Sequence, residues 1–146
     1  MTTPQIKNRG FTLVELLIVI VIIAILTVIS LVAYNGIQNQ ARTSTSQGVV
    51  KNIADKVQIY NTEEGHYPAT LSALSGNGDR NEAWHLDANA YVVDGSAAPT
   101  NAPTGNDGPK TVSFRACGTA GQETGVTIWG WDFSNGRAIE RVVGVC

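Results

Sequence analysis

A long apolar run near the start of the chain dominates its hydrophobic pattern. Residues 11–33 are almost entirely apolar, with a single carboxylate, Glu15, five residues into the run. At about 1.5 Å per residue, a helix of this length spans about 34 Å, which is enough to cross a bilayer. The run is too long for the apolar core of an ordinary signal peptide, and no small-x-small cleavage site follows it. The pattern therefore predicts a membrane-spanning helix.

Polar residues appear at helical intervals from Tyr34 onward, so the helix is expected to continue in a different environment. Four apolar residues recur there at steps of three and four: Val50, Ile53, Val57 and Tyr60. This spacing predicts an amphipathic helix over residues 34–64, with one face packed on a globular core. Gly65 suits a C-terminal cap and Pro68 cannot continue the helix. Asn35-Gly36 is the expected weak point, because glycine lowers helix stability.

The remaining residues, 65–146, predict a small globular head. Residues 69–110 are rich in Gly, Asn, Ala, Pro and Ser, which is typical of surface loops, with a short helix near residues 70–74 and a short strand near 91–93. Stronger strand patterns follow at residues 111–117, 126–133 and 138–143. Asn135-Gly136 between the last two runs predicts a β-hairpin with a two-residue turn.

A two-residue turn would place Phe133 opposite Ala138 and Trp131 opposite Glu140. One face of the hairpin then carries three aromatic residues, and the other carries Val126, Ile128, Ile139, Arg141 and Val143. Either face could rest on the helix, and we favour the aliphatic one. The tryptophans would then be available to a neighbouring molecule, although a pair of tryptophans is more often part of a core.

A motif at the start of the apolar run explains Glu15. A carboxylate inside a membrane span costs free energy, so a chain that keeps one needs a partner for it. The residues around it are Lys7-Asn8-Arg9-Gly10-Phe11-Thr12-Leu13-Val14-Glu15-Leu16. This segment resembles the N-terminal signature of the type IV pilin family, a short basic leader that ends in Gly, followed by Phe and then by Glu four residues later. The likeness covers about the first sixty residues.

The resemblance implies how this end of the chain is processed and used. In the family, a prepilin peptidase cuts after the Gly and methylates the new amino terminus, which would place cleavage between Gly10 and Phe11. Residues 1–10 would then be a leader. The equivalent Glu pairs with the terminal amine of an adjacent subunit during assembly, so Glu15 and the Phe11 amine become the expected assembly pair. In hydrocarbon, each of these charges is costly alone, and their attraction is strong.

The charges and cysteines fit an exported head. Lys7 and Arg9 precede the span, so the N-terminus should stay in the cytoplasm and the head should lie outside. Cys117 and Cys146 both fall in that exported part, where disulfides persist, and we expect them to pair. Removal of the leader takes away two basic residues, so the formal charge goes from 10 basic and 12 acidic residues (−2) to 8 and 12 (−4).

Other functions have little support in the sequence. No nucleophile and base motif, phosphate-binding loop or paired carboxylates stand out, so we expect neither an enzyme nor a cofactor. His66 and His85 are interpreted as structural histidines. Nucleic-acid binding lacks a basic surface. Asn77, Asp79, Asn81 and Glu82 could hold calcium, but their spacing is not that of an EF-hand, and we expect no metal site.

These observations predict the precursor of a type IV pilin-like subunit. The expected fold is α+β, with a long N-terminal helix packed on a small antiparallel β-sheet, the ladle-shaped fold of the family. The protein would begin as a single-pass protein of the cytoplasmic membrane. It would then polymerise with other pilin subunits into an extracellular filament on the bacterial cell surface, for adhesion, twitching motility or DNA uptake.

That interpretation also implies partners and leaves alternatives. The implied partners are the prepilin peptidase and methyltransferase, and an assembly platform with its ATPase. One alternative is a pseudopilin of a type II secretion or competence system. An alternative of another class is a ligand-binding domain on a single membrane anchor, which would have no leader cleavage.

Overall fold

The computed structural model describes residues 10–75 and 82–146, which form parts of two compact units, Met1–Ile37 and Gln38–Cys146. The helix α1 (Leu13–Glu64) contributes to both units and continues through Asn35-Gly36 without a break. Its end matches the expectation. Gly65 follows it with a φ of 79°, a conformation that glycine adopts without strain, and the Gly65 N–H donates to the Asn61 carbonyl at 3.0 Å.

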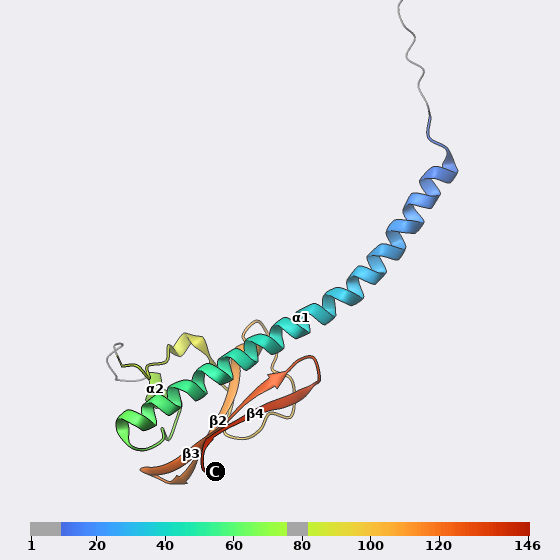
Figure 1. Cartoon of the computed structure of the whole chain (residues 1–146). Helices are drawn as coiled ribbons and strands as arrows, with labels where there is room; N and C mark the ends of the chain where they lie inside the picture. Colours follow the sequence, from blue (N-terminus) through green and yellow to red (C-terminus); the bar gives the residue numbers. More distant parts are fainter. Residues whose placement is uncertain (1–9, 76–81) are drawn as a thin grey trace, which may run out of the picture. The chain divides into compact units, whose positions relative to one another are not determined.

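The described part of the first unit, residues 10–37, consists mainly of the apolar half of α1, which is drawn in blue in Figure 1. The side chains of this half are exposed. This helix is long and apolar enough to cross a membrane. The exposed fractions of its side chains show whether the rest of the chain covers it. The large apolar side chains of residues 13–37 are between 47% (Val21) and 87% (Leu13) exposed, so the described part of the chain buries no face of this half of the helix. Such a surface needs lipid or other protein chains around it.

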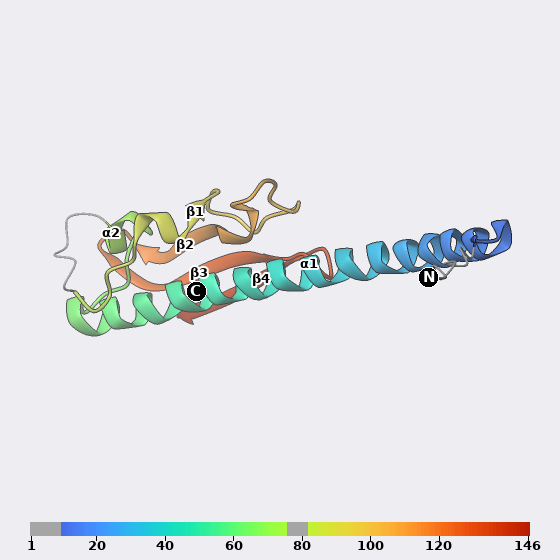
Figure 2. The ribbon, with the colours of Figure 1, turned by 90° about the horizontal axis from the view of Figure 1, so that it is seen from above.

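The second unit combines the other half of α1 with a four-stranded sheet. The strands are β1 (Val92–Val93), β2 (Thr111–Thr119), β3 (Gln122–Asp132) and β4 (Arg137–Gly144). Their order in the sheet is β1-β2-β3-β4, with β1 parallel to β2 and the other neighbours antiparallel (Figure 2). Three short helices lie in the segments before β2: α2 (Ser72–Ser75), η1 (Ala88–Ala90) and η2 (Gly108–Lys110). The α+β fold predicted from the sequence is confirmed.

The core lies between α1 and the aliphatic face of the sheet. Val50, Ile53 and Val57 are almost fully buried, and Tyr60 packs partly buried against the same cluster, as the helical spacing predicts. From the sheet, the cluster includes Val126, Ile128, Phe114, Val112 and Val143, and from the loops Leu71, Leu74, Trp84, Leu86 and Tyr91. Each aliphatic side chain of this size stabilises the fold by about 1.5–3 kcal/mol when fully buried. The expectation that the aliphatic face rests on the helix is confirmed.

The helix and the sheet approach each other closely at Gly130 of β3. A Cβ atom at this position would lie 2.6 Å from the Ser46 hydroxyl oxygen and 2.8 Å from Val50 Cγ2. The fully buried Ser46 hydroxyl in turn accepts a hydrogen bond from the Trp131 N–H at 3.0 Å. A glycine on the strand and a serine on the helix therefore bring the two backbones together and satisfy a buried N–H.

The hairpin between β3 and β4 differs from the prediction of a two-residue turn. Asp132 pairs with Arg137 and Trp131 with Ala138, so four residues form the loop and the register is shifted by two. The cause is Asp132. Its carboxylate accepts the N–H groups of Ser134 and Asn135, each at 3.0 Å, and its carbonyl accepts the Gly136 N–H at 2.8 Å. Because the shift is two residues rather than one, each side chain stays on its predicted face.

Of the two interpretations of the hairpin tryptophans, exposure at the surface is wrong and burial, the commoner role of a tryptophan pair, is confirmed. Trp129 and Trp131 are only 5% and 6% exposed, although they lie on the face of the sheet opposite α1. The Arg115 guanidinium lies 5.1 Å above the Trp129 ring, and η2 lies against β3. The loops before β2 thus bury this face of the sheet, and the alternation of residues along the strands does not predict that burial.

Candidate functional site

The start of α1 is built around Glu15. Thr12 immediately precedes the helix, and its N–H donates to Glu15 Oε2 at 2.8 Å. The Thr12 hydroxyl also donates to Glu15 Oε2, at 2.6 Å, and the Glu15 N–H is 3.2 Å from the same hydroxyl. Thr-x-x-Glu with these reciprocal bonds is a capping box, which satisfies N–H groups that a helix start leaves without partners.

The capping box places a negative charge where a helix favours it. The amino end of a helix carries a partial positive charge, so a carboxylate in the first turn is stabilised there. Glu15 nevertheless stays exposed, and its side-chain hydrogen bonds to described residues use only one of its two oxygens, Oε2. The site thus holds the carboxylate in place while leaving acceptor capacity for another group. Sequence reasoning identified Glu15 but not its partner Thr12, although the Thr-x-x-Glu spacing is visible in the sequence.

Gly10 and Phe11 precede the capping box and are exposed, Phe11 to 87%. A Cβ at Gly10 would have no neighbour within 4 Å. The peptide bond between these residues is therefore not packed against any described part of the chain, and an enzyme could reach it. Lys7 and Arg9 of the expected leader lie outside the described residues.

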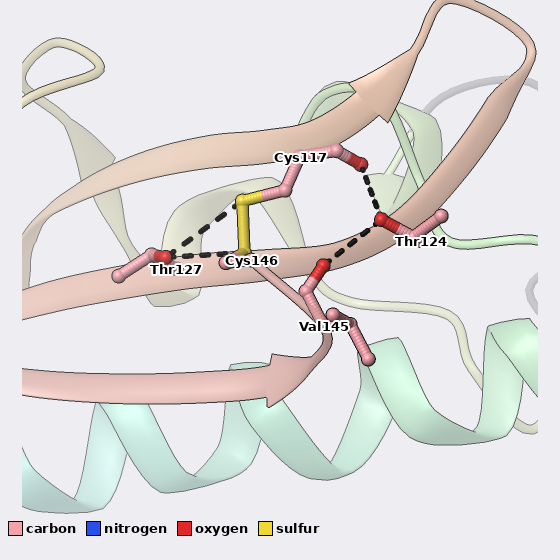
Figure 3. The surroundings of a disulfide bond; sticks show 5 residues. All are labelled: Cys117, Thr124, Thr127, Val145 and Cys146. Carbon is pink, nitrogen blue, oxygen red and sulfur yellow. Dashed lines mark hydrogen bonds between the residues drawn. A yellow bond between two sulfur atoms is a disulfide. The ribbon is translucent and has the colours of Figure 1, made fainter.

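The disulfide at the other end of the chain joins Cys117 of β2 to Cys146 (Figure 3). Its Cα atoms are 5.2 Å apart and the two cysteines are 29 residues apart in the sequence. The Thr127 hydroxyl lies 3.4 Å from the Cys146 sulfur, and the Thr124 hydroxyl donates to the Val145 carbonyl at 2.9 Å. The predicted pairing is confirmed, and it fixes the last residues of the chain to the sheet.

The other candidate residues form no assembled site in the described part of the chain. His66 Nδ1 lies 3.0 Å from the Tyr67 carbonyl oxygen, which fits a structural role. Among the described residues, no group of three or more His, Cys, Asp or Glu side chains could hold a metal ion. Asn77, Asp79 and Asn81 of the possible calcium loop lie outside the described residues, while Glu82 is described and exposed.

Comparisons with known proteins agree with the features of this N-terminus. Residues 6–31 match the family model described as the prokaryotic N-terminal methylation motif. The matched segment contains Gly10, Phe11 and Glu15. No solved structure matches the chain.

Three curated proteins show similarity over longer segments. The chain is 32% identical over 121 residues to fimbrial protein EcpC of Eikenella corrodens, which covers 83% of this chain and 72% of that protein. It is 32% identical over 68 residues, 47% of its length, to type II secretion system core protein G of Pseudomonas aeruginosa, of which it spans about half (48%). It is also 32% identical over 78 residues to competence protein ComGC of Halalkalibacterium halodurans, covering 53% of this chain and 76% of that protein.

Proposed function

Because the chain belongs to the type IV pilin-like family, we propose that it is the precursor of a structural subunit that polymerises through its N-terminal helix into a surface filament. The observation that carries this proposal is Glu15. One carboxylate is held by a capping box at the start of a helix whose first half is otherwise largely apolar and exposed. A plain membrane anchor needs the apolar surface, and the capping box uses one oxygen of Glu15, but the charge and the second oxygen call for a further partner.

Processing would convert this end of the chain into a paired set of charges. Cleavage between Gly10 and Phe11 creates an amine on Phe11, and N-methylation keeps its positive charge. In a filament, the Phe11 amine of one subunit would meet Glu15 of its neighbour. Each charge is costly in an apolar bundle unless it is paired, and the attraction grows as the two groups approach, so this pair would set the axial register of the subunits.

The apolar half of α1 would lie in two environments in turn, first the membrane and then the filament. As a precursor, the protein would span the cytoplasmic membrane once, with the disulfide-bonded head outside. After extraction by an assembly platform and its ATPase, the same apolar side chains would pack against those of other subunits. The same exposed apolar side chains, from Leu13 to Ile37, would thus serve both roles.

A second candidate is a pseudopilin of a secretion or competence system. It is favoured by the similarity to secretion protein G and to ComGC, which covers about half of this chain in each case. We favour the pilin because the alignment with the fimbrial protein spans 121 residues and therefore extends into the head. The filament's task, whether adhesion, twitching motility or DNA uptake, depends on partners of the head.

Intact mass of protein sheared from the surface of expressing cells tests the proposal. We expect a species that begins at methylated Phe11 and is two hydrogens lighter without reductant than with it. Processed protein found in the membrane fraction alone would favour the pseudopilin. Full-length protein that still carries residues 1–10 would contradict both and leave a plain membrane-anchored domain.

The pairing role of Glu15 needs its own test. Glu15→Gln removes the charge but keeps an oxygen that can accept from Thr12, so the helix start should survive and cleavage after Gly10 should continue. We expect the sheared filament fraction to fall by at least about tenfold, because the loss of one ionic partner leaves a costly unpaired amine. Glu15→Asp is the matched control, which keeps the charge. Normal filament yield in Glu15→Gln would refute the register role.

A further inference from the structure

The edge of β2 is only partly covered by β1. The two strands pair at Val92 with Thr111 and at Val93 with Val112. The Asp94 N–H then donates to the Val112 carbonyl at 2.9 Å, and the Phe114 N–H donates to the Gly95 carbonyl at 3.1 Å. These bonds establish that Val112 and Phe114 direct their backbone groups away from β3, toward this edge.

Past Phe114 the edge is open. Backbone direction alternates along a strand, so the Phe114 carbonyl and the N–H and carbonyl of Ala116 face the same edge. Among the residues that the structure describes, none forms a hydrogen bond to these three groups. The open stretch ends at the irregularity between Cys117 and Gly118. It therefore offers an acceptor, a donor and an acceptor in the spacing that an added strand requires.

A hollow of about 520 Å³ lies beside this open edge. One wall is the segment 69–72 and the other is the β2 segment 114–116, with Tyr91, Val93 and Ser96 between them. Val93 is 53% exposed although it lines an apolar surface. The volume falls within the range of about 300–1,000 Å³ that is typical of ligand sites. Apolar side chains of an added strand could enter it.

Arg115 provides a positive charge on the opposite face of the same strand. Arg115 lies between Phe114 and Ala116, so its side chain points to the other side of the sheet, where its guanidinium stacks on Trp129. Arg115 is exposed, and no ion pair involves it in the described part of the chain. A strand added at this edge would place one residue beside Arg115 and its two neighbours beside the apolar side of β2.

We propose that the open edge of β2 at Phe114–Ala116 binds an extended peptide segment of a partner protein, with the order apolar, acidic, apolar. The backbone of that segment would extend the sheet past the end of β1. Its two apolar side chains would enter the hollow, and its acidic side chain would face Arg115 across the strands. Opposite charges across a strand pair stabilise it, and like charges destabilise it.

A second folded copy of this chain does not fit the site. The order apolar, acidic, apolar occurs in this sequence at residues 14–16, 86–88 and 131–133. The first lies inside α1, while Leu86 and Asp132 of the other two are buried at 2% and 6% exposure. The partner is therefore a different protein with a flexible or terminal segment. This inference concerns the head and does not depend on the proposed role in a filament.

Binding of a defined probe to the full chain in detergent micelles tests the site. The probe is the peptide acetyl-Ser-Val-Glu-Val-Ser-amide, titrated into protein labelled for NMR. We expect a saturable shift of the Ala116 amide and slower hydrogen exchange there, because that N–H gains an acceptor. The matched peptide with Lys in place of Glu should bind about tenfold more weakly.

Two variants separate the parts of the site. Arg115→Glu should reverse the preference, so that the Lys peptide binds more tightly than the Glu peptide, while Arg141→Glu on β4 should leave the original preference unchanged. Ala116→Pro removes the edge N–H and should abolish binding of both peptides. If Ala116→Pro does not fold, the change of peptide preference in Arg115→Glu still tests the proposed site.

Three outcomes would overturn the inference. The first is no saturable shift at peptide concentrations of about 1 mM, the weak limit of useful affinity. The second is unchanged peptide preference in Arg115→Glu. The third is a shift of the Ala116 amide that follows protein concentration without any peptide, which would assign the edge to a second copy of the chain.

Discussion

Substitution of Gly130 by alanine tests how α1 is held on the sheet. The added Cβ would lie 2.6 Å from the Ser46 hydroxyl oxygen and 2.8 Å from Val50 Cγ2, both within the buried interface. Either the helix moves away from β3, or Ser46 turns to another rotamer. In the second case, the Trp131 N–H loses the acceptor that now lies at 3.0 Å.

Both responses carry a similar cost. Overpacking a well-packed core typically costs about 1–3 kcal/mol. A buried N–H without a partner costs about 1–3 kcal/mol as well. We therefore expect Gly130→Ala to lower the free energy of unfolding of the head by about 1–3 kcal/mol, whichever response the chain adopts. Ser46→Ala should cost about 1–3 kcal/mol, and the double variant should cost less than the sum, because both changes disturb one contact.

Urea unfolding of the full chain in micelles, followed by tryptophan fluorescence, measures these changes. Gly48→Ala is the matched control. Gly48 lies in α1 with nothing within 4 Å of an added Cβ, so alanine there should stabilise by up to about 1 kcal/mol through helix propensity. A Gly130→Ala protein within about 0.5 kcal/mol of the original, or strictly additive effects with Ser46→Ala, would refute the close approach as a stabilising contact.

Three further predictions concern the head. Hydrogen bonds, foremost from the Asn135 side chain, lower the pKa of Asp132 below its usual value. The contribution of this carboxylate to stability should therefore be complete above about pH 4 and disappear as the pH falls through the lowered pKa. Asp132→Asn should unfold more easily at pH 7 and lose less stability on acidification, as urea midpoints at pH 7 and at acidic pH would measure. Reduction of Cys117–Cys146 should lower the free energy of unfolding by about 3.5 kcal/mol in the chain-entropy model, checked by urea titration with and without reductant. Gly65→Ala should cost about 1–2 kcal/mol in the same assay, because its φ of 79° is unfavourable for alanine.

The parts of the fold that depend on local pattern could be predicted from the sequence. The stripe Val50, Ile53 and Val57 identified the buried face of α1, and Gly65 marked its end. These signals are local, because helix periodicity and a C-terminal cap involve residues a few positions apart. Pairing of Cys117 with Cys146 was predictable since these are the two cysteines of the chain.

Other parts were not predicted, either because a local hydrogen-bond network was missed or because distant segments meet. The hairpin register followed from the hydrogen bonds of Asp132, and Asn-Gly alone suggested a shorter turn. Burial of Trp129 and Trp131 depends on how loops far away in the sequence cover the sheet, which strand alternation does not encode. Of the candidate site, Glu15 was identified from its cost in a membrane, whereas its capping by Thr12 was visible in the sequence and overlooked.

The hydrogen bonds of the β3–β4 loop also affect the chemical stability of its Asn-Gly sequence. Asn-Gly is the sequence most prone to deamidation, in which the glycine nitrogen attacks the asparagine side-chain carbonyl. Here, the Gly136 nitrogen donates its hydrogen to the Asp132 carbonyl at 2.8 Å, and the Asn135 side-chain nitrogen donates to the Asp132 carboxylate at 2.7 Å. Both reacting groups are thus engaged by Asp132, and ring closure requires the loop to open. After storage for weeks, peptide mapping should find Asn135 intact. In Asp132→Ala, Asn135 should become the first residue to deamidate.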